Sequence, residues 1–383
     1  MRKVAIVVVI LIVFAAGGAL WLKAELARPY RGFSAPQIFV DIPRGTSRWS
    51  IASLLQHNGV IHSRLAFLFL SERHHRWVLQ AGEYMFDQAV TPRQVFAQIA
   101  SGRIFVHVVV VPEGWTMFDI AAELERQRLC TKAEFLSVAR EASLVRDIAP
   151  KAKDLEGFLF PSTYQFSRNA SPKEMVGTMV REFREEWSKI QTTARQNPPA
   201  EGAGRDPVQM PGTAALPALT PVEVVTLASL VERETPQPQE RPIVASVFCN
   251  RLKIGVPLQC DPTVQYALEL AGKPTPKVSA EDLHIQSPYN TYLHRGLPPG
   301  PIANPGDASL RAALNPAQTH YLYFVANGAG GHFFSNTLEE HNRNVQKYKR
   351  ILAGLPPEPP PPVHARRSVT RQAARKKKAR SQQ

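Results

Sequence analysis

The stretch TPVEVVTLASLVERETP, residues 220 to 236, has the clearest secondary-structure signals in the chain. Thr220, Pro221 and Glu223 stand at the N-cap, N1 and N3 positions of a capping box, so a helix is expected to begin here. It is expected to end at Thr235-Pro236, because the residue before a proline avoids helical backbone angles. The stretch therefore predicts one helix with a defined beginning and end.

The two glutamates at the end of this helix point in different directions. Glu234 extends the apolar stripe of the helix, which contains Leu227, Leu230 and Val231. Glu232 lies about 200° around the helix from Glu234, so the two cannot form a shared carboxylate dyad. Glu232 is interpreted as a solvated or structural residue.

Glu234 is the stronger candidate for chemistry. Loss of hydration beside an apolar stripe would raise its pKa and keep the carboxyl protonated near neutrality. A protonated carboxyl is what the cleavage of a glycosidic bond requires. The alternative from geometry alone is a terminal glutamate that reaches water or pairs with Arg233 or Arg241.

Four longer segments accompany ASLVERE in a fixed order: LEGFLFPSTYQF (155–166), VASVFCNRLKIGVPLQCDPTVQYAL (244–268), SPYNTYLHRGLPPGPIANPG (287–306) and HYLYFVANGAGGHFFSNTLEEHN (320–342). Together with the VPEGWT segment and the apolar N-terminus they resemble the endolytic murein (peptidoglycan) transglycosylases of the MltG/YceG-like family. The resemblance covers nearly the whole chain except an insertion near 191–219 and the basic tail. It implies that Glu234 is the catalytic residue and that the region before the catalytic domain is LysM-like.

The resemblance implies non-hydrolytic cleavage of the β-1,4 bond between N-acetylmuramic acid and N-acetylglucosamine. Glu234 would protonate the glycosidic oxygen and then deprotonate the muramoyl C6 hydroxyl, which closes on C1 to give a 1,6-anhydro end. Such a lyase needs no second carboxylate and no cofactor. The implied partners are peptidoglycan strands and, as candidates, cell-wall synthases, and the implied role is cell-wall assembly. Only the resemblance favours cleavage inside strands over cleavage at their ends.

Other polar residues are candidates for substrate binding. Asn290 and Tyr292 lie in an irregular Pro/Gly-flanked loop, and their amide and phenol groups suit acetamido and hydroxyl recognition. Gln259 is a weaker candidate with a free polar side chain. Asp261 precedes Pro262 and a helix, so it is expected to be an N-cap. A purely structural turn is the alternative for Asn290 and Tyr292.

Glu156 is a buried-looking acid among aromatic residues. It is counted with the candidate substrate-binding residues and is the second choice for a catalytic residue, and a structural hydrogen bond to the backbone explains it equally well. His332 and His341 could suggest a metal site, but no zinc-type triad accompanies them, so no metal is expected. The segment NGAGG (327–331) predicts a hairpin turn and not a phosphate loop, because no helix with a GK[ST] motif follows.

The N-terminus predicts a membrane anchor. Residues 1–3 precede an unbroken apolar run over 4–22, and nineteen helical residues span roughly 28 Å, close to the hydrocarbon thickness of a bilayer. A cleaved signal peptide is the alternative, but its apolar region would be shorter. The short N-terminal end is expected in the cytoplasm, which places the catalytic domain on the periplasmic side of the inner membrane.

A weak internal repeat follows the anchor after a short basic linker. IPRGTSRWSIASLL (42–55) and VPEGWTMFDIAAEL (111–124) align with matched Pro, Gly, Ile and Leu positions. Each predicts strand, tight turn and helix, with a second helix from about Ser63 and from about Thr131. The expected organisation is therefore a LysM-like or repeat region over 38–150 and a catalytic domain over 151–352, within an α+β fold class.

Net charge is +14, but the Pro-rich basic tail 355–383 contributes half of it, with eight Lys/Arg and one acid. The body is only mildly basic, so nucleic-acid binding is not expected. The segment 191–219 is rich in Pro, Gly and Ala and predicts a flexible insertion. The three cysteines, Cys130, Cys249 and Cys260, have no metal or disulfide spacing; a Cys249–Cys260 bridge stays open as an alternative.

Two other functions stay open from the sequence. A true peptidoglycan hydrolase would need a second carboxylate, Glu156 or Asp261, to activate water. A non-catalytic, membrane-anchored glycan-binding scaffold would use the repeat region and the tail.

Overall fold

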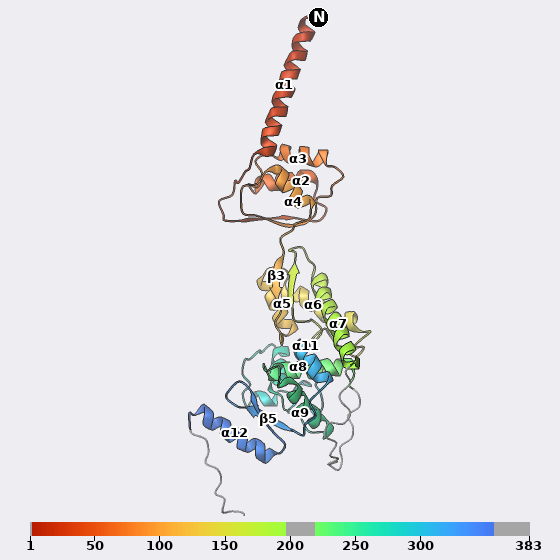
Figure 1. Ribbon diagram of the computed structural model, residues 1–383, viewed down its shortest axis with the longest axis vertical. Coiled ribbons are helices and arrows are strands. Elements are labelled where there is room, and N and C mark those ends of the chain that lie inside the picture. Colours follow the sequence, from red (N-terminus) through yellow and green to blue (C-terminus); the bar gives the residue numbers. More distant parts are fainter. Residues whose placement is uncertain (1, 197–218, 356–383) are drawn as a thin grey trace, which may run out of the picture. The chain divides into compact units, whose positions relative to one another are not determined.

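The computed structural model describes residues 2–196 and 219–355, which form two compact units. Unit 1 comprises 2–196 with Leu219–Leu230 and Pro299–Leu310. Unit 2 comprises Val231–Pro298 and 311–355. Among the described residues the strands form three two-stranded antiparallel sheets, and helices make up most of the rest, as Figure 1 shows. The structure has the mixed α+β character that the sequence predicts.

Unit 1 consists, in chain order, of α1 (Arg2–Ala27), β1 (Ile38–Ile42), α2 (Arg48–His57), α3 (Arg64–Arg73), β2 (Gly82–Phe86), α4 (Pro92–Ala100), β3 (His107–Val110), α5 (Met117–Arg126), α6 (Lys132–Ala139), η1 (Ala142–Val145), β4 (Thr163–Phe166) and α7 (Pro172–Gln196). Unit 2 contains α9 (Arg241–Lys253), α10 (Asp261–Leu270), η2 (Asp282–His284), β5 (Tyr323–Ala326), β6 (His332–Ser335) and α12 (Leu338–Leu352). The residues of α8 (Pro221–Glu234) and α11 (Asp307–Leu314) are divided between the two units.

The internal repeat is confirmed as a repeated strand–helix–helix–strand arrangement. β1 pairs with β2 and β3 pairs with β4, each time across two intervening α-helices, to which the second copy adds the short 3-10 helix η1. The second helices begin where the sequence indicates, with Ser63 and Thr131 as their N-caps. Gly45 and Gly114 occupy the matched turns with φ of 81° and 79°, a backbone region that side chains with a Cβ rarely adopt. The same turn chemistry therefore closes both copies.

The first copy has its own hydrophobic core, to which α2, α3, α4 and both strands contribute. α1 reaches this core: Leu26 is buried in it, and Leu22 packs against it. The basic linker is therefore shorter than the apolar run alone suggests, because the helix continues to Ala27 and only residues 28–37, with Arg28 and Arg31, connect it to β1. Of the described residues, α1 is the helix whose length and apolar composition would allow it to cross a membrane.

Two other sequence expectations need comment. The start predicted for the insertion, residue 191, is too early in the chain, because α7 continues as a helix to Gln196. Residues 197–218 of that segment, and the tail from residue 356 onward, lie outside the described residues. The division into 38–150 and 151–352 remains a sequence-based prediction, since unit 1 holds all of the first range and part of the second.

The hairpin turn predicted at NGAGG is confirmed. β5 pairs with β6 directly across this segment, and the Asn327 N–H donates to the Gly331 carbonyl at 2.8 Å. Helix α12 packs against both strands, and Asn344 donates to the Ser335 hydroxyl at 2.9 Å. The hairpin thereby fixes the position of His332, the first residue of β6.

Candidate active site

Glu234 is the last residue of α8, as the capping and stop signals predict. Helix α8 begins after Thr220, whose backbone N–H donates to the Glu223 carboxylate at 2.8 Å. The stripe residues Leu227, Leu230 and Val231 are fully buried. Glu234 itself is half-buried, so one side of the residue stays accessible. The geometry places a carboxyl at the edge of an apolar stripe.

Burial and four neighbouring side chains determine the pKa of Glu234. Desolvation raises the pKa of Glu234 to about 7, and the charge of Asp261 acts in the same direction. A hydrogen bond with the Cys260 thiol and the charges of His332 and Arg233 lower the pKa. The residue as a whole keeps some exposure to solvent. Protein atoms nevertheless surround its carboxyl, so desolvation has the largest effect on the pKa of Glu234. The result is a carboxyl that can hold or release its proton near neutral pH.

The segment that carries Cys260 and Asp261 is held by hydrogen bonds to the loop after η2. The Gln259 N–H donates to the Thr291 carbonyl at 3.2 Å, and the Cys260 N–H donates to the Thr291 hydroxyl at 3.0 Å. The Thr263 hydroxyl lies 2.9 Å from the Thr291 hydroxyl and also donates to the Cys260 carbonyl at 2.7 Å. These bonds fix Cys260 beside Glu234.

Asp261 is not the N-cap that the sequence predicts. Cys260 holds the N-cap position of α10, and Asp261 is the first helical residue. The reason is that Pro262 can occupy either of the first helical positions, so the proline alone does not fix the register. The Asp261 carboxylate accepts a hydrogen bond from the Tyr292 hydroxyl at 2.5 Å.

Tyr292 is connected to Glu234 indirectly: its hydroxyl donates to Asp261, and the charge of Asp261 acts on Glu234. Burial, and then the hydrogen bond and charge of Asp261, raise the pKa of Tyr292 well above its usual value. The phenol therefore keeps its proton and acts as a donor. The charge of Glu234 also contributes to the shift, so Tyr292 and Glu234 lie in the same electrostatic environment.

Asn290 is completely buried and shapes the loop that presents Tyr292. Its amide nitrogen donates to the carbonyls of Leu283 and Ile285 at 2.9 and 3.0 Å. Its side-chain oxygen accepts from the Tyr292 N–H at 3.0 Å. The polar atoms of Asn290 therefore engage the protein itself, and its predicted contact with a substrate remains a prediction.

Gln259 is exposed, but its side chain is not free as the sequence suggested. Its side-chain oxygen accepts from the Arg251 guanidinium at 2.6 Å. Its φ of 52° is unusual for a residue with a Cβ and costs of order 1 kcal/mol. The surrounding hydrogen bonds, including that of the Gln259 N–H to Thr291, hold this conformation.

The pair formed by His332 and Glu240 was not predicted from the sequence. His332 Nδ1 lies 2.7 Å from the Glu240 carboxylate, and the His332 N–H donates to the same group at 2.9 Å. Burial alone would raise the pKa of Glu240, but the hydrogen bonds from His332 hold it below its usual value. In the sequence, only the position of His332 just after the hairpin turn could have indicated this pair. The charge of His332 lowers the pKa of Glu234.

Glu156 belongs to unit 1 and has a structural environment. It is 1% exposed, and its carboxylate accepts from the Met117 N–H at 3.0 Å, at the beginning of α5. The Asn304 amide donates to it at 2.9 Å. The carboxylate thus joins a helix N-terminus to another segment of the same unit.

Replacement of Glu156 by alanine is expected to destabilise unit 1 by about 1–3 kcal/mol, because buried donors lose their acceptor. Urea unfolding followed by tryptophan fluorescence measures this, since all five tryptophans precede residue 198. Glu125→Ala is the control, because its ion pair with Lys132 is exposed. An equal loss in both variants would contradict the structural role.

Two remaining expectations concern metals and disulfides. Within 2–196 and 219–355 no group of His, Cys, Asp and Glu side chains is arranged to hold a metal ion. His341 stacks on Tyr323 with ring centroids 5.2 Å apart. The three cysteines are free, and Cys249 and Cys260 are buried without a bridge.

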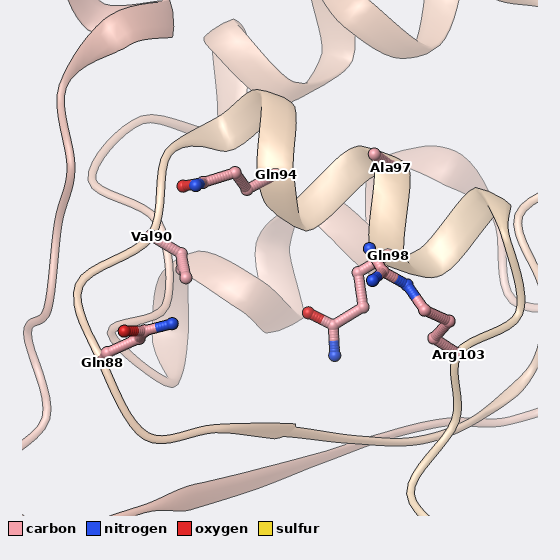
Figure 2. A pocket seen from close by; sticks show the side chains of 6 residues that line it. All are labelled: Gln88, Val90, Gln94, Ala97, Gln98 and Arg103. Carbon is pink, nitrogen blue, oxygen red and sulfur yellow. The ribbon is translucent and has the colours of Figure 1, made fainter.

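A separate pocket of about 430 Å³ lies in unit 1, and no carboxylic acid is among the residues that line it. Figure 2 shows Gln98 extending from α4 into the pocket and Gln88 approaching from the adjoining loop. The rest of the lining consists of Val90, Gln94, Ala97 and Arg103. Its groups can form hydrogen bonds but cannot supply acid–base chemistry.

Comparison with known proteins gives one consistent result. A protein from Bacillus subtilis named endolytic murein transglycosylase is 32% identical over 348 residues, which cover 87% of this chain and 90% of that protein. One of the same name from Streptococcus pneumoniae D39 is 26% identical over 84% of this chain, but only 60% of that protein is covered. A crystal structure of a YceG-like protein from Listeria monocytogenes shares 32% identity and covers 80% of this chain and 98% of that chain, with a TM-score of 0.52. The sequence model of the YceG-like family matches residues 40–347, and the chain belongs to this family.

Proposed function

We propose that this chain is a membrane-anchored lytic transglycosylase that cleaves the MurNAc–GlcNAc β-1,4 bond inside peptidoglycan strands and leaves 1,6-anhydro-MurNAc ends. The observation that carries the proposal is the desolvated carboxyl of Glu234, a half-buried residue, with a pKa of about 7. Support also comes from the names of the relatives in Bacillus and Streptococcus. The proposed role is in cell-wall assembly.

In the first step, protonated Glu234 donates its proton to the glycosidic oxygen as the bond from C1 to that oxygen breaks. The charge that develops on the sugar is that of an oxocarbenium ion. In the second step, the Glu234 carboxylate takes the proton of the muramoyl C6 hydroxyl. The C6 oxygen then bonds to C1, and Glu234 returns to its protonated form without consuming water.

The neighbours of Glu234 suit this two-step role. Burial and Asp261 favour the protonated acid that the first step uses. The Cys260 thiol and the charges of His332 and Arg233 favour the carboxylate that the second step uses. A pKa near 7 balances the two forms, which is efficient when one group must both give and take a proton.

Product analysis tests the proposal. Purified glycan strands treated with the full-length chain are expected to yield fragments that end in 1,6-anhydro-MurNAc, each lighter by one water than a hydrolysis product. Mass spectrometry before and after borohydride reduction distinguishes them, because anhydro ends are not reduced. Reducing ends alone would reject the transglycosylase mechanism.

A hydrolase is the second candidate, and one observation favours it. Asp261 lies close enough to Glu234 for its charge to raise the pKa of Glu234, so two carboxyl groups share this environment. A second carboxylate could activate water, as in two-carboxylate glycosidases. Its hydrogen bond with Tyr292 argues for an electrostatic role instead. The product analysis separates the two functions.

Asp261→Asn is expected to shift the basic limb of kcat/KM to lower pH. The negative charge of Asp261 raises the pKa of Glu234, so its removal lowers that pKa. The protonated acid is then lost at a lower pH than in the parent chain. The pH profile of strand cleavage measures the shift, and Glu339→Gln, which alters an exposed carboxylate, is the control. A profile unchanged by Asp261→Asn would show that Glu234 is not the titrating acid.

The remaining parts of the proposal concern location and binding. Helix α1 would anchor the chain in the inner membrane, with the rest of unit 1 and unit 2 on the periplasmic side, and a reporter fused to the C-terminus that proved cytoplasmic would reject this. The region 38–150 would be a LysM-like part that positions glycan. The polar lining of its pocket supports that role, because amide groups suit hydroxyl and acetamido partners. Cell-wall synthases are the proposed protein partners.

A further inference from the structure

An unusual surface lies on α3, where apolar side chains face outward. Leu65 and Phe69 are separated by one helical turn and are 58% and 41% exposed. The guanidinium of Arg64 lies over the ring of Trp49, 4.7 Å from its centroid, and Trp49 is also exposed. We call Trp49, Arg64, Leu65, Phe69 and Arg73 the α3 patch. Its combination of tryptophan, arginine and outward apolar groups is typical of surfaces that meet a membrane interface.

Helix α3, which carries most of the α3 patch, lies next to the end of α1, as Figure 1 shows. His62, just before α3, is bonded through Nδ1 to the Glu25 carboxylate of α1 at 2.8 Å. Leu26 is buried in the same core to which α3 contributes Phe67 and Leu70. The body that carries the patch therefore contacts α1 directly, by packing and by a hydrogen bond, in addition to the chain connection through residues 28–37.

The length of α1 places the patch at a definite depth. Its continuous apolar run ends at Leu22, and Glu25 lies three residues beyond, which is about 4.5 Å along the helix. The headgroup layer on each side of a bilayer is roughly 5–7 Å thick. If the apolar run fills the hydrocarbon, the contact between Glu25 and His62 therefore lies within the headgroup layer, and α3 begins there.

Charge around the patch is mainly positive. Within 62–78 the arginines are Arg64, Arg73 and Arg76, and the one acid is the exposed Glu72. Trp77 and Val78 follow α3 and are also exposed. Arg48 holds this turn by donating to the carbonyls of His75 and Trp77 at 2.7 and 3.1 Å. The turn is therefore held in place while its apolar side chains stay outside.

From these observations we propose that the α3 patch is a membrane-docking surface that lies on the outer headgroup layer of the bilayer that α1 crosses. Leu65 and Phe69 enter the boundary between headgroups and acyl chains, and the arginines contact anionic lipid phosphates. The inference rests on the proposed anchoring by α1 but adds a second, separate contact. Its consequence is that the first strand–helix–helix–strand body lies on the membrane and does not extend freely away from it.

The test uses the full-length chain in nanodiscs of phosphatidylcholine or of an equimolar mixture with phosphatidylglycerol. An environment-sensitive fluorophore is attached at Phe69→Cys, with Val108→Cys as the matched control, since Val108 is an exposed apolar residue that lies on β3 and does not belong to the α3 patch. Burial raises the pKa of the native Cys130 to about 11, and Cys249 and Cys260 are buried, so the introduced thiol is labelled selectively.

The expected result is that brominated lipids quench the probe at position 69 but not the probe at position 108. Anionic lipid should strengthen the quenching, and Arg73→Gln should weaken that dependence. In a second pair of variants, Phe69→Glu should reduce quenching at Leu65→Cys, whereas Phe69→Leu should preserve it.

Failure of the docking and failure of the anchor give different results. If the chain co-purifies with nanodiscs but the probe at position 69 behaves like that at position 108, α1 inserts and the docking proposal is rejected. If the chain does not associate with nanodiscs at all, the anchor is rejected and the docking proposal with it.

Discussion

Glu234→Gln is expected to reduce the rate of strand cleavage by about 10²–10⁴-fold, the usual contribution of a general acid–base group. The amide has nearly the same shape as the carboxyl but cannot donate a proton to the glycosidic oxygen or remove one from the C6 hydroxyl. Both proposed steps therefore lose their catalyst. Release of anhydro-muropeptide fragments from purified strands, followed over time by mass spectrometry, measures the loss.

The matched control is Glu223→Gln on the same helix. Glu223 accepts from the Thr220 N–H through its side-chain oxygen, and an amide oxygen can take over that bond. Full activity in Glu223→Gln, with loss in Glu234→Gln, would assign the effect to the acid and not to α8. Retained activity in Glu234→Gln would remove the basis of the mechanism.

Arg241→Met is expected to destabilise unit 2 by about 3–5 kcal/mol, because it leaves a buried carboxylate without its cation. The Arg241 guanidinium donates to the Glu232 carboxylate at 2.8 Å, and the two side chains are only 6% and 4% exposed. Tryptophan fluorescence cannot follow this unit, since the tryptophans precede residue 198. Hydrogen exchange of the α9 amides under increasing denaturant measures the change.

The double variant Arg241→Met/Glu232→Leu is the control for this prediction. Replacing both members of a buried ion pair with apolar groups of similar size is often neutral, so most of the lost stability should return. If the double variant were as unstable as Arg241→Met alone, the uncompensated charge would not be the cause of the loss.

The sequence predicted the parts of the site that depend on local rules. Capping and stop signals located α8, and helical periodicity separated Glu234 from Glu232. The periodicity could not show that Glu232 would be buried, because its partner Arg241 follows after the helix has ended and the chain has turned. A helix pattern describes which residues share a face, but not what later packs against that face.

The electrostatic neighbours of Glu234 were harder to predict for a similar reason. Cys260, Asp261 and His332 come from α10 and from the start of β6, and no sequence spacing relates them to residue 234. Asp261 was assigned to the wrong helix position, since Pro262 fits more than one register. The sequence contained every residue of the site, but the hydrogen bonds to Thr291 and the hairpin, which bring them together, are tertiary.

Cys260 gives the site an internal reporter of local opening. Cys260 is 1% exposed as a residue, and burial, together with the charge of Glu234, raises the pKa of its thiol well above the usual value. Alkylating reagents need an accessible thiolate, so they can attack Cys260 only when the segment separates from Glu234 and admits solvent. The alkylation rate of Cys260 would therefore measure how often the surroundings of Glu234 open, in a chain whose proposed catalytic residue has not been altered. A ligand that closes over Glu234 should slow that reaction in proportion to its occupancy.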